Sequence, residues 1–312
     1  MKARKLGSQG PSISVIGFGA WEAGGEAWGP NPPDDQTISA MHTAIDNGMT
    51  WIDTAEVYGG GRSEELVGRA LQGRDDVLVF TKIAPQPSGT GFERGSVRKA
   101  AEKSLERLGR DAIDLYQLHW PSSDVALEET WEAMAGLVDE GLVKHIGVSN
   151  FDRDRIERCE KVRHVDSLQP HFSMLHPKGR DDLFLFCAEN GTGIIAYGPL
   201  GFGLLTGAVT EKTEFTDDDW RGGGHGTRAY DTMFAPGKFE RNLEIVDALR
   251  PVADRLGITL AQLALAWVVH QKGTTGAIAG SRSPKHVAEN AQGGSVELGE
   301  KDLEEMDSII TG

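Results

Sequence analysis

The chain has 312 residues, of which 39% are hydrophobic and 25% are charged, and this is the composition of an ordinary globular protein with ample material for a core. Its 47 acidic and 32 basic residues give a formal net charge of -15, which repels nucleic acid backbones and anionic lipid surfaces at long range. The charge therefore argues against nucleic acid and membrane partners, and any anionic ligand must be held by local geometry.

The cysteines and the N-terminal residues indicate a cytoplasmic protein. Cys159 and Cys187 form neither a disulfide framework nor a CxxC pair, which favours a reducing compartment. The first residues lack the continuous apolar segment of a secretory signal, and the sequence has no run of about 18 apolar residues that would span a bilayer. We expect both thiols to be buried and structural.

Short apolar strands alternate with helical segments along almost the whole chain. The predicted strands are 14–19, 50–53, 77–82, 114–120, 143–149, 166–170, 193–199 and 276–281, and the helical segments that follow them are 35–47, 62–72, 94–108, 126–140, 152–161, 180–190, 238–271 and 284–292. Such repetition requires a mainly parallel sheet covered by helices. Eight units in about 250 to 300 residues favour a closed (β/α)8 TIM barrel over an open doubly wound sheet. The prediction is an α/β fold with a single barrel domain over residues 1–312.

Two segments depart from this repetition. Residues 2–14 precede the first barrel strand and carry Gly-Ser and Gly-Pro turn signals, which favour a hairpin that closes the barrel bottom. Residues 201–237 follow the seventh strand and are rich in glycine, aspartate and threonine. A stretch this long without clear periodicity is usually functional or disordered. We expect either a mobile flap over cofactor or substrate, or a plain surface loop.

Polar residues end several of the otherwise apolar strands. They are Asp53, Lys82, His119, Ser149, Asn150 and Gln169, with Tyr58 in the loop after Asp53 and Tyr197 in the seventh strand. In an eight-fold barrel the active site is built from the C-terminal ends of the strands and the loops after them. We therefore expect these side chains to face one rim of the barrel.

Three of these residues predict a catalytic acid. By themselves, Asp53 could cap a turn and Tyr58 could cover the edge of the core. Lys82 at the end of a buried strand needs a partner, and Asp53 on the neighbouring strand is the obvious one. A structural ion pair does not explain why a phenol and the imidazole of His119 project into the same region. A phenol, whose pKa is ordinarily about 10, becomes a useful acid at neutral pH when a nearby ammonium stabilises its phenolate.

Eight segments together resemble a known family in their order and spacing. They are GFGAW, WIDTAEVYGGGRSEELVG, VFTK, DLYQLHWP, GLVKHIGVSNF, LQP, AYGPLGFGLLTG and AGSRSPKHVAEN. They resemble the aldo-keto reductases over nearly the whole chain. The resemblance implies a barrel that reduces aldehydes and ketones with a nicotinamide cofactor, bound without a Rossmann domain. It further implies that Tyr58 is the general acid, that Lys82 and Asp53 tune it, and that His119 orients the carbonyl.

The same resemblance indicates where the cofactor binds. Ser149, Asn150 and Gln169 are implied to hold the nicotinamide carboxamide, and Tyr197 is implied to stack on the ring. The other implied contacts lie in two segments, with Gly198, Leu200, Gly201 and Gly203 in the first and Gly280, Ser281, Arg282, His286, Glu289 and Asn290 in the second. In the first segment, Gly201 and Gly203 have no side chains that would keep backbone amides from approaching the pyrophosphate.

The second segment favours NADPH. Ser281 and Ser283 precede a helix that opens at Pro284, where free amides and the helix dipole favour an anion. Arg282 supplies a planar cation suited to a 2'-phosphate. Some members of the family carry a lysine at the position of Gly280 and an arginine at that of His286. Both are absent here, so NADH stays an alternative cofactor.

Other residues carry weaker signals. His164, His171 and His176 match no zinc-binding spacing, so we expect no metal site. Three tryptophans in or beside rim loops either line a substrate pocket or pack as core or interface aromatics, and these are Trp21, Trp28 and Trp120.

The predicted function is NADPH-dependent reduction of a small-molecule carbonyl compound to an alcohol, with hydride transfer from the nicotinamide and a proton from Tyr58. The first alternative is the reverse reaction, in which NAD(P)+ oxidises an alcohol or sugar. The second is a cofactor-binding regulatory subunit that senses redox state, and a hydrolase on the same barrel is a distant third. No motif names the substrate or the oligomeric state.

Overall fold

Eight parallel strands form a closed barrel at the centre of the molecule. A computed structural model of the chain describes residues 1–85, 92, 94–122, 125–222 and 231–312. The barrel strands are β3 (Ile16–Gly19), β4 (Trp51–Asp53), β5 (Leu78–Ile83), β6 (Ile113–Leu118), β7 (Val143–Ser149), β8 (Ser167–Gln169), β9 (Gly193–Ala196) and β10 (Thr274–Ala279). They follow chain order around the barrel, and β10 closes it by pairing with β3 through Ala277 and Ile16. The predicted (β/α)8 barrel is confirmed.

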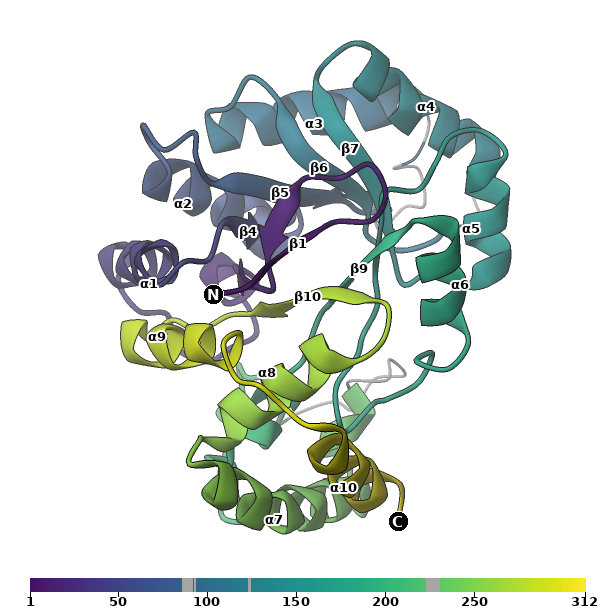
Figure 1. Ribbon diagram of the computed structural model, residues 1–312. Helices are drawn as coiled ribbons and strands as arrows, with labels where there is room; N and C mark the ends of the chain where they lie inside the picture. Colours follow the sequence, from purple (N-terminus) through teal and green to yellow (C-terminus); the bar gives the residue numbers. More distant parts are fainter. Residues whose placement is uncertain (86–91, 93, 123–124, 223–230) are drawn as a thin grey trace.

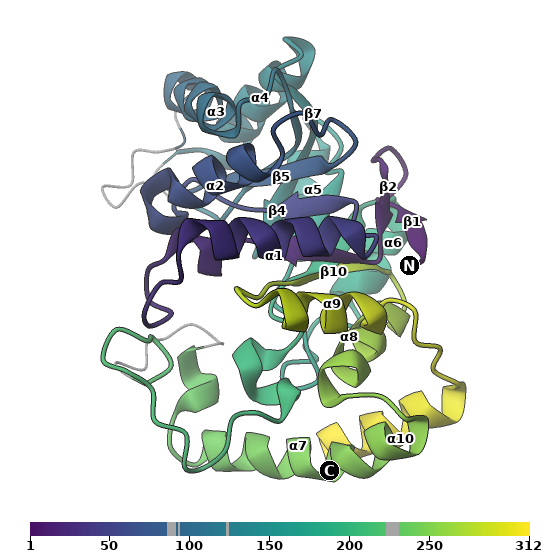
Figure 2. The same cartoon turned by 90° about the vertical axis from the view of Figure 1, so that its left-hand side faces the viewer.

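Helices cover the outside of the barrel, as Figure 1 and Figure 2 show. They are α1 (Asp34–Asp46), α2 (Arg62–Ala70), α3 (Arg94–Leu108), α4 (Leu127–Asp139), α5 (Arg153–Glu160), α6 (Leu183–Asn190), α7 (Lys238–Leu256), α8 (Leu260–His270), α9 (Pro284–Gly293) and α10 (Glu300–Thr311). Within the described ranges no single helix is long and apolar enough to cross a membrane, although the bent pair α7 and α8 passes that test jointly by length and composition.

Local sequence signals set several helix ends. Helix α8 begins with a capping box, in which the Thr259 hydroxyl accepts from the amide of Gln262 and the Gln262 side chain accepts from the amide of Thr259.

Helix α10 lies outside the eight predicted units. It packs against α7, with Met306 fully buried and Asp307 accepting a hydrogen bond from the indole of Trp267.

The predicted N-terminal hairpin is present and covers one end of the barrel. Strands β1 (Ala3–Lys5) and β2 (Ser12–Ser14) pair antiparallel, and Leu6 and Ile13 are fully buried with apolar side chains of the barrel interior such as Trp51. A Cβ on Gly7 would lie 2.4 Å from the carbonyl oxygen of Gly191, just before β9. The hairpin therefore seats on the N-terminal ends of the strands.

The opposite end of the barrel carries the long loops. The loops after β3 and β9 reach this end, away from the hairpin (Figure 2). The described part of segment 201–237 contains two short 3-10 helices, η3 (Gly201–Thr206) and η4 (Asp231–Phe234). It contacts the loop after β3, where the amide of Trp220 donates to the carbonyl of Ala27 over 3.0 Å. Residues 223–230 of the expected flap lie outside the described residues. The flap and the single-domain division stay predictions.

Candidate active site

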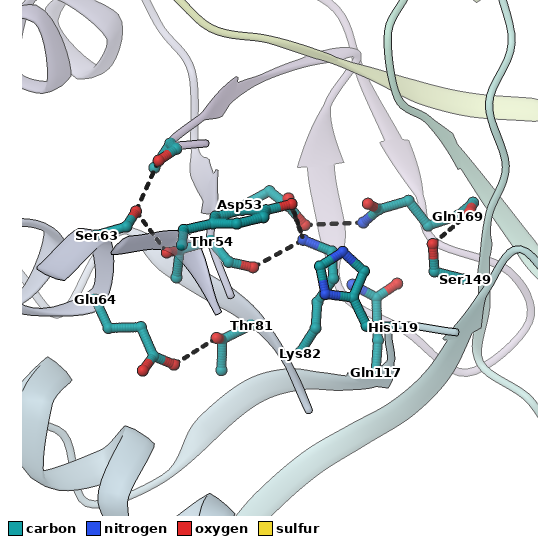
Figure 3. Close-up of polar contacts among 12 residues, drawn as sticks. Asp53, Thr54, Ser63, Glu64, Thr81, Lys82, Gln117, His119, Ser149 and Gln169 are labelled. Atoms are coloured by element: carbon teal, nitrogen blue, oxygen red, sulfur yellow. Dashed lines mark hydrogen bonds and ion pairs between the residues drawn. The ribbon is translucent and has the colours of Figure 1, made fainter. Parts of the chain in front are cut away.

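A buried ion pair lies at the C-terminal ends of β4 and β5. Lys82 Nζ lies 2.5 Å from Asp53 Oδ1 and donates to the carbonyl of Thr54 over 2.7 Å (Figure 3). The exposed fraction of the two side chains is 0% for Lys82 and 4% for Asp53. Burial, the largest influence on both groups, lowers the pKa of Lys82 and raises the pKa of Asp53, and the opposite charge of each partner works against these shifts. The pair expected from the sequence is present.

Tyr58 is brought to this pair by a glycine turn. Its hydroxyl lies 3.4 Å from Lys82 Nζ, and its ring centre lies 5.1 Å from the same nitrogen. The three glycines after it have positive φ angles, and a Cβ on Gly59 would lie 2.1 Å from the carbonyl oxygen of Gly24. Only glycine takes this backbone without strain in so little space. The turn therefore supports the position of the phenol.

His119 faces Tyr58 from the end of β6. The two rings lie 5.6 Å apart at 79°, and Trp120 stacks on the imidazole with ring centres 3.8 Å apart. Burial, with the nearby positive charge of Lys82, holds the pKa of His119 well below its usual 6.5. The imidazole is therefore neutral at physiological pH and can donate one hydrogen bond to a polar group in front of it.

A cluster of amide and hydroxyl groups continues the rim on β7, β8 and the end of β9. Gln169 donates its side-chain amide to Asp53 Oδ2 over 2.8 Å, and Ser149 donates to the carbonyl of Gln169 over 2.8 Å (Figure 3). Asn150, which has a φ of 62°, donates to the carbonyl of His119 and accepts from the hydroxyl of Tyr197. The cluster is therefore hydrogen-bonded directly to the catalytic candidates.

One cavity of about 680 Å³ joins these residues to the start of α9. It is lined by every residue predicted for catalysis, cofactor or substrate except Lys82 and Gly201. Lys82 is fully buried, with its ammonium on Asp53. Gly201 is buried too, in the turn where a Cβ would meet Leu175 and Leu205. Lys82 therefore contacts its protein neighbours and is not exposed to a ligand in the cavity.

The far end of the cavity fits a phosphate group. Helix α9 has Pro284 at its start, and the side chain of its N-cap residue, Ser283, does not cap its first amides. The amide of Ser283 itself donates to the Ser281 hydroxyl. Ser281 and His286 line the cavity beside this helix end. Free amides at a helix N-terminus favour an anion. A nicotinamide dinucleotide is thus matched by polar side chains at one end and an anion site at the other.

The backbone around Gly280 leaves no room for a side chain. A Cβ at this position would lie 2.3 Å from the carbonyl oxygen of Gly19 on the neighbouring strand. Any larger residue, lysine included, therefore requires a backbone shift.

The guanidinium of Arg282 already has partners within the protein. Its guanidinium donates to the carbonyls of Trp28 over 2.7 Å and Pro30 over 2.9 Å. Its Nε lies 3.5 Å from a carboxylate oxygen of Glu22. All three groups belong to the loop after β3. The guanidinium has five N–H donors, so a phosphate can share it with these groups, but the phosphate then meets the carboxylate of Glu22.

The three predicted pocket tryptophans line the cavity. Trp21 stacks near Tyr58, with ring centres 6.2 Å apart, and Trp28 meets Trp21 edge to face at 4.9 Å. Trp28 also belongs to a buried apolar cluster with Phe202 and is 7% exposed. The two interpretations offered for these residues are therefore compatible, since one ring can line the pocket and pack in a cluster.

Two charged residues of the cavity were missed from the sequence, Glu22 and Arg221. Glu22 directly follows Trp21, so a charge beside a predicted pocket residue was an available signal. Arg221 lies in the irregular segment after β9 and pairs with Asp219, with its guanidinium over the ring of Trp28. Nothing local in the sequence distinguishes that placement. In the part of the chain that the structure describes, no group of three His, Cys, Asp or Glu residues is arranged to hold a metal.

Comparisons with known proteins agree with the barrel fold. The model of the Aldo/keto reductase family matches residues 15–311. The chain is 33% identical to Aldo-keto reductase YhdN of Bacillus subtilis (strain 168), over 99% of this chain and 94% of the relative. Its fold is similar to that of glycerol dehydrogenase AKR11B4 from Gluconobacter oxydans, with a TM-score of 0.86 and 29% identity over 99% of this chain and 94% of the other.

A second solved structure carries a bound nucleotide. It is an aldo/keto reductase from Klebsiella pneumoniae in complex with NADP and acetate. The match covers 98% of this chain and 95% of the chain in that structure, at 30% identity and a TM-score of 0.74.

Proposed function

Because the chain belongs to the aldo-keto reductase family, we propose that it reduces small-molecule aldehydes or ketones to alcohols with NADPH, using Tyr58 as the general acid. The chain is an NAD(P)H-dependent oxidoreductase that acts on carbonyl or alcohol groups, as its family is. The identity of the acid, the direction of the reaction and the cofactor preference are the parts that we propose.

The observation that carries the proposal is the set of contacts made by Lys82. Its ammonium contacts the carboxylate of Asp53, the carbonyl of Thr54 and the hydroxyl of Tyr58. The first two contacts fix the buried cation, and the third directs it at the phenolic oxygen. A cation held in this way stabilises the phenolate that remains after Tyr58 has given up its proton.

Tyr58 and His119 have separate roles in the proposed reaction. The bound NADPH supplies the hydride that the carbonyl carbon accepts. Tyr58 donates its proton to the carbonyl oxygen as negative charge develops there. His119, which is neutral, donates a second hydrogen bond to the same oxygen and so orients the carbonyl. The product is the alcohol, and Tyr58 is reprotonated from solvent before the next turnover.

NADPH is the proposed cofactor because the cavity ends at the N-terminus of α9, beside Arg282. The Klebsiella pneumoniae relative was crystallised with NADP. The residues proposed to hold the nicotinamide are Ser149, Asn150, Gln169 and Tyr197. The experiment is the initial rate of NADPH consumption, with NADH in parallel, against aromatic aldehydes, dicarbonyls and aldoses. Turnover in wild type that is lost in Tyr58→Phe supports the proposal.

One comparison favours the reverse reaction as a second candidate. The Gluconobacter oxydans structure is a glycerol dehydrogenase, and this chain matches it with a TM-score of 0.86. The same acid and base serve both directions, since Tyr58 as phenolate can take the proton from an alcohol. Reduction of NADP+ or NAD+ in the presence of glycerol and other polyols tests this candidate. Faster turnover of polyols than of any carbonyl would favour it.

We also propose that the protein works in a reducing, cytoplasmic environment. Cys159 and Cys187 are free and buried, and burial raises the pKa of each thiol to about 12. Thiols of this kind are inert structural groups. Full retention of activity under reducing conditions is expected, and a requirement for oxidation would contradict the assignment.

A further inference from the structure

Arg282 is engaged by one loop through each of its nitrogen atoms. Nη1 donates to the carbonyl of Pro30, Nη2 donates to the carbonyl of Trp28, and Nε faces Glu22 at 3.5 Å. The backbone carbonyl of Arg282 in turn accepts from the side-chain amide of Gln36 over 3.1 Å. The cation proposed for the 2'-phosphate is therefore already held by the loop that leads from β3 to α1.

Glu22 is the anionic member of this set. It begins the short helix η1 (Glu22–Gly24), lines the cavity, and keeps 26% of its side chain exposed. Burial raises the pKa of its carboxyl, while Arg282, Arg221 and His286, all of which line the same cavity, work against that rise. Arg221 is already paired with Asp219 through two hydrogen bonds. The positive charge at this end of the cavity is therefore largely balanced by carboxylates.

The carboxylate beside Arg282 affects the binding of the 2'-phosphate, the group that distinguishes NADPH from NADH. NADPH differs from NADH by a phosphate on the adenosine ribose, where NADH has a neutral hydroxyl. A phosphate monoester carries between one and two negative charges near neutral pH. It must displace Glu22 from Arg282, or bind against the repulsion of a carboxylate in a partly buried site where charges are poorly screened. A hydroxyl meets no such opposition and can donate to the carboxylate.

We propose that Glu22 sets the cofactor selectivity of this enzyme, because its carboxylate competes with the ribose 2'-phosphate for Arg282. Arg282 and the end of α9 would by themselves favour the binding of NADPH over that of NADH. Glu22 reduces this difference in affinity. This inference rests on the proposed function, since it takes a nicotinamide dinucleotide as the cofactor. Glu22 is a specificity-determining residue and takes no part in the transfer of hydride or proton.

The test measures binding of NADP+, NAD+, 2',5'-ADP and 5'-AMP to wild type and to Glu22→Gln by titration calorimetry. The two shorter nucleotides isolate the 2'-phosphate from the nicotinamide. We expect Glu22→Gln to tighten NADP+ and 2',5'-ADP by about tenfold and to change NAD+ and 5'-AMP by less than about twofold. Urea unfolding of each variant verifies that the fold is intact.

Glu26→Gln is the matched control. Glu26 lies exposed on the same loop, so its substitution makes the same change in net charge away from Arg282. The ratio of NADP+ to NAD+ affinity should equal that of wild type in this variant. The pair Arg282→Gln and Arg282→Gln/Glu22→Gln completes a double-mutant cycle. If the competition is for Arg282, removing Glu22 in that background should improve NADP+ binding by less than about twofold.

The outcomes separate this inference from the function on which it rests. An affinity ratio that is the same in wild type and Glu22→Gln overturns the role of Glu22, while binding of either dinucleotide leaves the proposed function standing. A full tenfold gain that persists without Arg282 also overturns the competition. Failure of wild type to bind any of the four nucleotides overturns the proposed function and this inference together.

Discussion

The side-chain amide of Gln169 donates a hydrogen bond to Asp53 Oδ2 over 2.8 Å. The other oxygen of the same carboxylate receives Lys82 at 2.5 Å. One residue of the proposed nicotinamide site thus also fixes the carboxylate that pairs with Lys82. Gln169 lies 116 positions after Asp53 in the chain, and the curvature of the barrel brings β8 and β4 together. The residue proposed to hold the nicotinamide is therefore hydrogen-bonded to the ion pair proposed to tune the acid.

Substitution of Gln169 tests this link. Gln169→Leu removes both the contact proposed for the nicotinamide and the hydrogen bond to a buried carboxylate, so we expect weaker NADP+ binding together with a lower kcat. Loss of one hydrogen bond to a charged buried group destabilises by about 1.5 to 3 kcal/mol. Calorimetry, steady-state kinetics and urea unfolding measure the three effects. A variant that changes only KM would show that Gln169 serves the cofactor alone.

Replacement of Tyr58 by phenylalanine removes the proposed acid with little change in shape. We expect kcat to fall by about 10²- to 10⁴-fold, which is the usual contribution of a positioned proton donor. NADP+ affinity should stay within about threefold of wild type, because binding does not use the hydroxyl. Stopped-flow rates and calorimetry measure both quantities. Turnover near the wild-type value would require a different acid.

The Asp53 and Lys82 pair should respond differently to single and double substitution. Removing either partner leaves a buried charge without compensation, which costs about 3 to 5 kcal/mol of stability. The double variant Asp53→Leu/Lys82→Met replaces both charges with apolar groups and should recover most of that loss. Turnover should stay low in all three variants. Urea unfolding gives the stabilities, and equal losses in the single and double variants would contradict the pairing.

The buried imidazole of His171 should make the folded protein less stable in mild acid. Burial lowers the pKa of His171 from 6.5 to about 3, so the folded state keeps it neutral while the unfolded state takes up a proton below the ordinary value. Its stabilising contribution is therefore complete above pH 6.5 and is lost as the pH falls towards the folded-state pKa. Between about pH 7.5 and about pH 5 this amounts to about 2 kcal/mol.

The measurement compares urea unfolding of wild type and His171→Gln at the two pH values. The difference in unfolding free energy between the two proteins should shift by about 2 kcal/mol in favour of the variant at the lower pH. A constant difference between wild type and His171→Gln would contradict the assignment of a neutral buried imidazole.

Segment 201–237 is predicted to become less sensitive to proteases when NADP+ binds. Its described part already contacts the loop after β3 through Trp220 and Ala27, and Gly203 lines the cavity. A ligand that contacts both loops should favour their closed arrangement. Limited proteolysis with and without saturating NADP+, followed by mass spectrometry of the fragments, locates the cleavage. Unchanged cleavage within the segment would support a plain surface loop instead.

The barrel and its catalytic rim were predictable because both depend on patterns that are local in the chain. Alternation of apolar strands with helical segments is a property of neighbouring residues, and eight repeats leave few ways to close a sheet. A polar residue at the end of an apolar strand is also a local feature. This is why Asp53, Lys82 and His119 could be assigned to one rim before their contacts were known.

Helix α10 and the environment of Arg282 were not predictable in this way. The helix follows the eighth unit, so the repeat does not require it, and Met306 alone among its residues is fully buried. Arg282 meets Glu22 from a position 260 residues later in the chain, and its other partners are backbone carbonyls, which are present in every loop.

The sequence by itself thus determined the fold class and the set of residues on the rim, since periodicity and strand-end chemistry are written locally. The resemblance of eight segments to the aldo-keto reductases indicated the family. Only the tertiary structure decided which long side chains are paired and which remain available to a ligand. That choice depends on how two loops pack across the barrel mouth, where the free energy of an ion pair is set by burial and distance and not by residue type.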